Sequence, residues 1–396
     1  MDGFTHGTKS SNMFKWIAFT IVIATVAGEE WCTTNKKIWG THTMAPQTCT
    51  LTSTVNVETK LIISGDGSGE TPIISGNGLT QLFTVYGELQ LSNLILEKGA
   101  TADCNGAGRN CDGGAIIAKK DCEDSSCGDD PPVMSLIHIL FRENQAVGNG
   151  GAVFITHHTV LTMEDSTFAG NVATTGSGGG LFATDMSTIT SVRTTFKNNA
   201  AGTNGGGLFA SAETTALTLT DSTFDGNTAT AGSGGGLYAK DMSTITSVRT
   251  TFKNNAADQN GGGLFASGPK TALTLTDSTF QANVATKGGA LFLSEKTVLT
   301  LEGTTLENNR AHVSGGAIAA HTSQIIVQGV VKFNNNIAFP KDADATEKNP
   351  QIVAQNSPGS EGKSPPLFSC GTCTPYCCMY LRHALTSPSL LFPPQH

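Results

Sequence analysis

The sequence is poor in aromatic residues, in charge and in clustered basic residues, and these shortages narrow the classes of protein that it can encode. Aromatic residues make up 7% and charged residues 14% of the 396 positions, whereas glycine occupies 46. Few large core residues and many glycine turns favour a repetitive β structure over a helical protein. The formal net charge is −8, and the lysines and arginines form no cluster. No nucleic-acid partner is therefore expected, because phosphate binding requires a positive surface.

Cysteine is missing from the middle of the chain, between Val133 and Leu367, so that stretch does not depend on disulfides. Six of the ten cysteines precede it: Cys32, Cys49, Cys104, Cys111, Cys122 and Cys127. The other four lie in the tail: Cys370, Cys373, Cys377 and Cys378. This number is typical of an exported protein, in which we expect the disulfides Cys32–Cys49, Cys104–Cys111 and Cys122–Cys127, although the sequence alone does not fix the pairings. In the tail, disulfides are favoured over a zinc half-site at the Cys-x-x-Cys motif.

Long apolar runs are also absent, apart from one at the N-terminus. Lys9 and Lys15 precede an apolar run over residues 16–27, and small residues end it at Gly28. The run is shorter than the about 20 residues that a membrane span needs, so we predict a signal peptide over residues 1–28 and a secreted or cell-surface protein. An uncleaved anchor is the alternative. Apart from such an anchor, we expect contact with a membrane only if it is made by a C-terminal region that is missing from this sequence.

What the sequence does contain is one phrase repeated eight times: an apolar residue, two spacers, Asn, one spacer and Ala. The apolar positions follow one another every 26 to 28 residues and are Phe141, Phe168, Phe196, Phe224, Phe252, Phe280, Leu306 and Phe333. The Asn positions are Asn144, Asn171, Asn199, Asn227, Asn255, Asn283, Asn309 and Asn336. Such a period predicts one supersecondary unit per repeat, each stacked on its neighbours.

Each repeat unit reads as three short strands separated by three turns. It opens on Gly-Gly and a small residue before an apolar strand, as in residues 178–181. An alternating strand follows, as in residues 217–220, and then a Ser-Thr-Phe strand, as in residues 222–224. Three strands and three turns predict one triangular coil of about 27–28 residues, and the chain is therefore predicted to be an all-β solenoid.

Alignment of the repeats predicts which residues point into the coil. One inward column holds Leu161, Ile189, Leu217, Ile245, Leu273, Leu299 and Ile326, and a second is the Phe column. Both should stack at the inter-strand spacing of about 4.8 Å, and their burial is the expected source of stability. We expect the Asn column at a turn, where Asn tolerates a left-handed backbone and its amide bonds to the Asn of the next coil.

Two outward columns alternate in charge. One, three residues before each Phe, reads Asp165, Arg193, Asp221, Arg249 and Asp277, and another, just after the Phe, reads Lys197, Asp225 and Lys253. The alternation follows from a duplicated two-coil unit, since residues 185–201 recur unchanged at 241–257. We predict salt-bridge ladders of about 0–1 kcal/mol per exposed pair. Their predicted role is register, because a one-coil slip would oppose like charges, and a ligand-binding charge stripe is the alternative.

One coil is longer than the others and carries an acidic insertion between Lys119 and Pro132. Its acidic residues are Asp121, Glu123, Asp124, Asp129 and Asp130. Insertions in solenoids emerge on one face, often the binding face, so this loop is the predicted recognition site. No cofactor is expected, and calcium at this loop is the one candidate, because clustered carboxylates suit that ion although their spacing matches no EF-hand. A solvated acidic loop is the alternative.

Composition divides the chain into five segments. We predict a signal peptide at 1–28, an N-terminal cap at 29–58, the β-helix at 59–338, a linker at 339–369 and a cysteine-containing tail at 370–396. The cap lacks the repeat and should cover the open end of the stack. The linker is rich in Pro, Ser, Lys and Asp. The tail is interpreted as the start of a truncated cysteine-rich module.

The Gly-Gly-Ala-Ile and Phe-x-x-Asn signals, repeated together, resemble the repeats of the polymorphic outer-membrane proteins, the chlamydial adhesin family. Residues 113–116 and 315–318 read Gly-Gly-Ala-Ile, and the Asn is kept in all eight phrases. The resemblance covers residues 113–338. It implies a right-handed parallel β-helix of the pectate-lyase-like superfamily and a surface or adhesive role.

Three functions are compatible with these observations. The first is a non-catalytic, adhesin-like or structural surface module, whose partner is an unidentified cell-surface protein or glycan. The second is a polysaccharide lyase or glycoside hydrolase, which requires paired carboxylates facing a groove. The third is binding of ice or glycan through an outward Thr column, which holds Thr162, Thr190, Thr218, Thr246, Thr274 and Thr300. Outward Thr is also what any solvated β face prefers.

Overall fold

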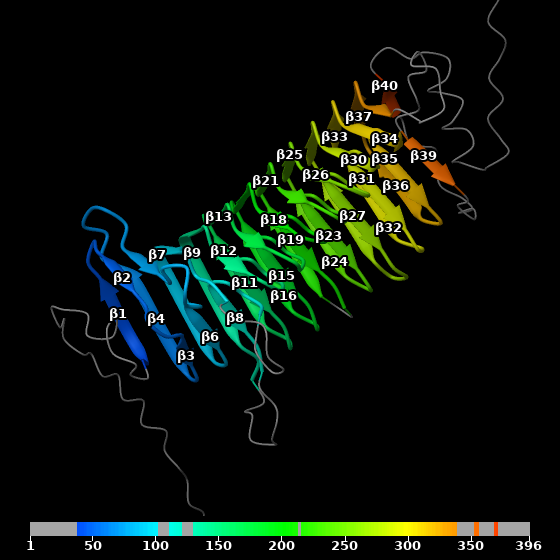
Figure 1. Ribbon diagram of the computed structural model, residues 1–396. Helices are drawn as coiled ribbons and strands as arrows, with labels where there is room; N and C mark the ends of the chain where they lie inside the picture. Colours follow the sequence, from blue (N-terminus) through cyan, green and yellow to red (C-terminus); the bar gives the residue numbers. More distant parts are fainter. Residues whose placement is uncertain are drawn as a thin grey trace, which may run out of the picture.

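The computed structural model describes residues 38–101, 111–120, 130–212 and 215–338 and the strands at 352–355 and 368–370. These residues form strands and turns, and no helix occurs among them. The chain winds into a right-handed parallel β-solenoid of about 10 turns, which appears in Figure 1 as a straight rod of stacked coils. The fold predicted from the repeat is therefore confirmed.

The coils are built from three parallel sheets, named A, B and C, and from β9 onward each regular coil passes through all three. Sheet A contains a row of long strands: β1 (Gly40–Met44), β4 (Lys60–Gly65), β7 (Glu88–Glu97), β9 (Val133–Arg142), β12 (Val160–Glu164), β16 (Thr188–Val192), β20 (Ala216–Thr220), β24 (Thr244–Val248), β28 (Ala272–Thr276), β32 (Val298–Glu302) and β36 (Gln324–Gln328). After a bend it contains a row of short strands: β2 (Thr48–Thr50), β5 (Ile73–Ser75), β13 (Thr167–Ala169), β17 (Thr195–Lys197), β21 (Thr223–Asp225), β25 (Thr251–Lys253), β29 (Thr279–Gln281), β33 (Thr305–Glu307), β37 (Val331–Asn334) and β40 (Phe368–Cys370). Strands β7 and β9 run through the bend and pair in both rows.

Sheets B and C complete the coil. Sheet B contains β3 (Val55–Val57), β6 (Phe83–Val85), β8 (Ile116–Ala118), β11 (Val153–Ile155), β15 (Leu181–Ala183), β19 (Leu208–Ala210), β23 (Leu237–Lys240), β27 (Leu264–Ser267), β31 (Leu291–Ser294), β35 (Ile318–His321) and β39 (Ile352–Gln355). Sheet C contains β10 (Gln145–Ala146), β14 (Val172–Ala173), β18 (Ala200–Ala201), β22 (Thr228–Ala229), β26 (Ala256–Ala257), β30 (Val284–Lys287), β34 (Arg310–Ser314) and β38 (Ile337–Ala338).

Sheet C is not among the three strands predicted for each coil, and it follows the turn at the Asn of the repeated phrase. In the structure the Ala that closes this phrase lies in a strand, and it is buried at Ala173 and Ala229. A regular coil therefore has four strand segments rather than three. A strand of two residues shows no periodicity, so the apolar pattern could not reveal it.

The solenoid begins before the predicted boundary at residue 59, and the cap assigned to residues 29–58 is wrong for its second half. Strand β1 pairs in parallel with β4, β2 with β5 and β3 with β6, so residues 40–57 form a coil. Met44 and Val57 are buried in the common core. The prediction failed because this coil lacks the Phe–Asn phrase and keeps only the alternation of apolar residues. Residues 29–37 lie outside the described part, as does the predicted signal peptide.

The solenoid also extends past the predicted end at Ala338. Strand β39 pairs with β35, and β40 pairs with β37, both in parallel. Both strands fall in the segment assigned to a linker, 339–369, except that β40 ends at Cys370, the first residue of the predicted tail. The linker assignment is therefore wrong at these two strands. Residues 371–396 lie outside the described part.

The core is built from the inward columns. Along the Phe column, Phe196 stacks on Phe224 and Phe224 on Phe252, with ring centroids 4.7 and 4.8 Å apart. All three rings are fully buried. The aliphatic column aligns as expected until its last residue, where Leu299 pairs with Ile325 rather than with Ile326. Stacking at the strand spacing buries apolar area continuously along the rod.

The Asn column forms a continuous buried ladder beside the Phe column. The side-chain amide of Asn199 donates to Oδ1 of Asn227 at 2.9 Å and to the carbonyl of Phe168 at 2.9 Å. The same pattern recurs along the column from Asn144 to Asn336. The expected left-handed residue, however, is the one before the ladder Asn, as at Asn198 with φ of 52°. The ladder Asn instead satisfies the backbone of this corner.

Candidate recognition surface

The acidic insertion emerges from the rod just after β8, and the structure describes only its two ends. The N–H of Lys119 donates to the carbonyl of Val85 at 3.1 Å, and the N–H of Val133 donates to the carbonyl of Gly87 at 3.0 Å. Asp130 lies within the described part and is exposed. Asp121, Glu123, Asp124 and Asp129 lie outside the described residues, so the calcium site stays a prediction. These two backbone hydrogen bonds to the preceding coil fix the positions at which the insertion leaves and rejoins the solenoid.

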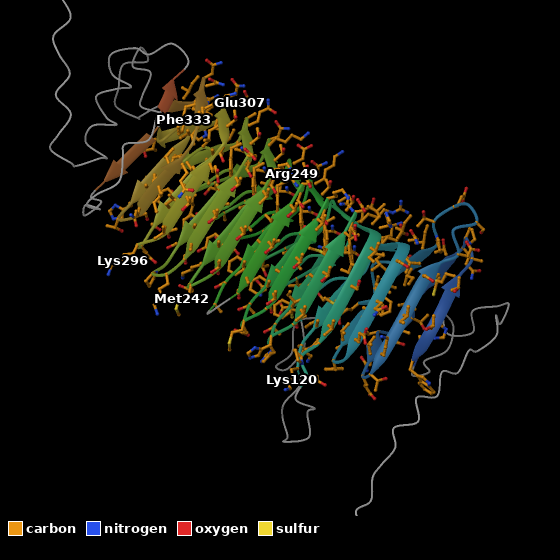
Figure 2. The ribbon with its side chains drawn as sticks, turned by 180° about the vertical axis from the view of Figure 1, so that it is seen from behind. Lys120, Met242, Arg249, Lys296, Glu307 and Phe333 are labelled. Atoms are coloured by element: carbon orange, nitrogen blue, oxygen red, sulfur yellow. The ribbon has the colours of Figure 1, made fainter. Side chains whose placement is uncertain are left out.

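Figure 2 places the base of this insertion on one edge of the rod. Lys120, Met242 and Lys296 project from this edge, whereas Arg249 and Glu307 project from the opposite edge. Met242 and Lys296 lie in the tight turns that join sheet B to the long strands of sheet A. The insertion therefore departs from the same row of turns that follows sheet B in every later coil.

Most of the predicted disulfide residues lie outside the described residues. Cys49 lies in β2, where it is buried, and Cys111 lies just before the Gly-Gly turn of its coil. Their expected partners, Cys32 and Cys104, are not described, nor are Cys122 and Cys127. The three pairings therefore stay predictions.

The two charged columns lie on the edge opposite the insertion. Arg193 donates from Nε to Asp165 at 2.7 Å, and Arg249 donates in the same way to Asp221 at 2.7 Å. The Arg193 guanidinium also contacts Glu164. Each Arg thus bonds to the Asp of the preceding coil, so the column consists of separate ion pairs rather than one unbroken ladder. In the second column, Lys253 lies 3.4 Å from Asp225.

The ion pairs set the protonation of their carboxylates. Hydrogen bonds from Arg193 hold the pKa of Asp165 below its usual value, and Arg249 does the same to the pKa of Asp221. A general acid needs the opposite shift, because it must carry a proton at working pH. Asp165 and Asp221 are also two coils apart with Arg193 between them. Their geometry is that of structural ion pairs rather than of a glycosidase carboxylate pair.

The outward face of sheet B carries a second aromatic column, which the sequence analysis missed. Its members lie in register across six strands and are Phe154, Phe182, Phe209, Tyr238, Phe265 and Phe292. In β15 the burial pattern is buried, half-buried, buried, so Phe182 points away from the core that Leu181 and Ala183 line. The Leu-Phe-Ala strands conceal this alternation, because both faces are apolar.

The rings of this column cover one another face to face. Phe182 and Phe209 have centroids 4.5 Å apart and planes inclined by 3°, and Phe209 stacks on Tyr238 at 4.9 Å. Tyr238 and Phe265, in the middle of the column, are buried, whereas the other four rings are half-buried and turn only their edges toward solvent. An aromatic edge carries positive partial charge and an apolar surface, so the column presents an apolar ridge rather than open ring faces.

Hydroxyl and carboxylate groups border the ridge on the side of the tight turns. Thr156 donates to Asp185 at 2.6 Å, and Ser267 donates to Glu295 at 2.9 Å. Burial, with smaller contributions from the charges of Asp241 and Glu295, raises the pKa of Tyr238 to about 12. The ridge therefore has a polar border, in which the carboxylates of Asp241 and Glu295 lie next to the lysines Lys240 and Lys296, along the same edge from which the insertion departs.

The long strands of sheet A present the predicted Thr column. Thr162, Thr190, Thr218, Thr246, Thr274 and Thr300 lie in register. Their side chains are exposed or half-buried. In the described residues, no three His, Cys, Asp or Glu side chains are grouped to hold a metal ion. That part of the chain also contains no helix long and apolar enough to cross a bilayer.

Comparison with known proteins agrees with the architecture. Residues 177–338 match the family described as right handed beta helix region, and residues 138–156 match the Chlamydia polymorphic membrane protein repeat. The resemblance of the repeats is thereby confirmed. No curated protein and no solved structure matches the chain.

Proposed function

We propose that this right-handed parallel β-helix protein, which carries a polymorphic-membrane-protein repeat, is a non-catalytic, adhesin-like recognition protein of the cell surface. The observation that carries the proposal is the outward aromatic ridge of sheet B, which is continuous over six coils and begins beside the acidic insertion. Four of its rings are half-buried and leave part of their apolar surface to solvent. Contiguous apolar surface rimmed by polar groups is a mark of protein interaction sites. Aromatic side chains are also enriched in the cores of interfaces.

The ridge favours a partner protein over a glycan. A sugar ring packs against the open face of an aromatic ring, and in this column each inner face is covered by the next ring. Apolar side chains of a protein can pack against ring edges without needing a face. The border of hydroxyl, carboxylate and ammonium groups, which includes the Lys240–Asp241 ion pair, would form the polar rim of such an apolar contact.

The two sites are adjacent in the fold. Ile117 of β8 pairs with Phe154 of β11, so the insertion departs from the strand next to the first ring of the ridge. A partner lying along sheet B would therefore meet the insertion at one end of its contact. Loops held on a rigid scaffold are common recognition elements.

The test is binding of the labelled full chain to intact cells of several types, before and after surface proteolysis or enzymatic deglycosylation. We expect proteolysis to reduce binding at least about tenfold, equivalent to about 1.4 kcal/mol, and deglycosylation to leave it unchanged. Loss of binding on deglycosylation alone would transfer the proposal to a glycan partner. Absence of binding to every cell type would refute the recognition role.

Two variants locate the contact. Phe182→Ser with Phe209→Ser removes two rings of the ridge, and we expect it to abolish binding. The matched control, Thr190→Ser with Thr218→Ser, alters two side chains in the same coils on the outward face of sheet A. It should bind as the unmodified chain does. Equal loss in both variants would show that binding does not use the ridge.

A further inference from the structure

The charged edge of the rod is divided into bands of one sign. Arg193 and Lys197 lie on either side of β17's Thr195, and Asp221 and Asp225 occupy the same two places in the next coil. Arg249 and Lys253 follow in the coil after that. The bands thus alternate positive, negative, positive along the axis, at the strand spacing of about 4.8 Å.

These charges remain accessible despite their ion pairs within the chain. The side chains of Arg193 and Arg249 are 48% and 55% exposed, and Asp221 is 38% exposed. Figure 2 shows Arg249 and Glu307 projecting outward from this edge. The bands can therefore meet a second charged surface without rearrangement of the coils.

The pattern complements itself in one orientation. Consider a second copy that lies antiparallel to the first, related to it by a two-fold axis perpendicular to the rod, between the coils of Arg193 and Asp221. Each charged column then faces the same column of the second copy, read in the opposite direction. Arg193 then lies opposite Asp221 of the second copy, and Lys197 opposite Asp225. Further out, Asp165 faces Arg249, and His138 faces Asp277. An isologous contact of this kind is the usual geometry of a two-fold dimer.

The parallel orientation has the opposite outcome. With the two-fold axis along the rod, each coil meets the same coil of the second copy, so the band of Arg193 and Lys197 faces itself. Like charges held this close repel, and such juxtapositions exclude wrong pairings. The same sequence feature that alternates charge between coils thus selects the direction of association.

We propose that this charged edge is a self-association surface, through which two copies of the chain pair antiparallel. The paired columns run from His138 to Asp277, about 24 Å over five coil intervals. A surface of this length is small beside that of stable dimers. The association is therefore weak and reversible, and it strengthens when many copies are held on one surface. It is independent of the ridge on sheet B.

Sedimentation equilibrium of the full chain tests the proposal. At an ionic strength of about 0.02 M we expect a monomer–dimer equilibrium, and at about 0.5 M the dissociation constant should rise at least tenfold, because salt screens exposed charges. A monomer at both ionic strengths, at concentrations of about 0.1 mM, overturns the proposal.

Exchanged charges separate association from folding. The variant Asp221→Arg with Arg249→Asp keeps an opposite-charge pair within the chain and the same net charge. In the antiparallel dimer, however, it places like charges opposite each other at two contacts between the copies: residue 193 with residue 221, and residue 165 with residue 249. We expect dimerisation to be lost while the melting temperature stays within a few degrees.

A fourfold variant provides the rescue. Adding Asp165→Arg and Arg193→Asp to the previous exchange inverts the charges at positions 165, 193, 221 and 249 and restores opposite charges in both antiparallel pairings. Dimerisation should return to within about threefold of the original constant. Dimerisation that survives the twofold exchange, or that is not restored by the fourfold exchange in a folded chain, overturns the antiparallel arrangement.

Discussion

Asn199 and Asn227 lie 28 residues apart and are joined by two hydrogen bonds that end on one atom. The backbone N–H of Asn199 donates to Oδ1 of Asn227 at 3.0 Å, and its side-chain amide donates to the same Oδ1 at 2.9 Å. One carbonyl oxygen thus satisfies the backbone and the side chain of the coil before it. Because the contact recurs from coil to coil, the amide column holds each turn at a fixed height on the next.

Replacement of Asn199 by Ala should be strongly destabilising. The change leaves the carbonyl of Phe168 and the N–H groups of Asn171 without their side-chain partner in a buried corner. We expect the free energy of unfolding to fall by about 2–4 kcal/mol, since each buried polar group left unpaired costs about 1–3 kcal/mol. Urea denaturation followed by circular dichroism measures the loss.

The matched control for this change is the neighbouring residue. Asn198 has φ of 52° and lies on the exposed side of the same corner. Asn198→Gly suits that conformation and should change the free energy of unfolding by less than about 0.5 kcal/mol. Similar losses in the two variants would mean that the corner, rather than the amide ladder, carries the stability.

The period of the sequence was sufficient to predict which residues share a column, because identical spacing forces like residues above one another. It predicted the stacking of Phe196 on Phe224 and the bonding of one Asn to the next. It assigned the left-handed backbone to the wrong residue, because Asn is favoured both there and at the neighbouring position. Asn198 and Asn199 are adjacent in the sequence, and only the structure shows that Asn198 has the left-handed backbone and that Asn199 belongs to the ladder.

The outward rings show where pattern reading fails. A half-buried strand is recognised by polar residues on its solvent side, and in Leu181-Phe182-Ala183 both sides are apolar. The outward position of Phe182 therefore leaves no polar signal in the sequence. The prediction missed the first coil for a different reason. Residues 40–57 pair in register with the next coil although they lack the Phe–Asn phrase by which the coils were recognised.

The tight turns after sheet B store strain that glycine should relieve. Asp185 and Met186 are consecutive residues with φ of 50° and 60°. A left-handed conformation costs a residue with a Cβ about 1–2 kcal/mol. Met186 is 42% exposed, so its side chain contributes little packing.

Met186→Gly should therefore raise the free energy of unfolding by about 0.5–1 kcal/mol, after the entropy cost of glycine in the unfolded chain is subtracted. Met186→Ala keeps the Cβ and should give no such gain. Thermal melts of the three proteins provide the comparison. A gain as large with Ala would attribute the effect to the exposed side chain instead.

Acid should weaken the rod partly through its ion pairs. The pKa of Asp221 lies below its usual value of 3.8 because Arg249 donates hydrogen bonds to it. Its contribution to stability is thus fully present above about pH 4 and is lost as the pH falls through the lowered pKa. Asp221→Asn should flatten the decline of melting temperature between about pH 4 and pH 2, and Arg249→Gln should flatten it equally. An unchanged decline in both variants would contradict this assignment.

Deletion of one coil tests whether the alternating charges fix the register. Removing residues 193–220 places Asp221 directly after Asp165 in the column, so two carboxylates meet where Arg193 met Asp165. We expect this protein to fold, because Phe, Asn and Gly positions still align, but to gain stability at high salt. Adding Asp165→Arg to the deletion restores an opposite-charge neighbour and should recover about 1 kcal/mol at an ionic strength near 0.02 M, and almost none at about 1 M. Recovery that is equal at both ionic strengths would show that the substitution acts by packing, and the charges would then have no part in holding one coil in place on the next.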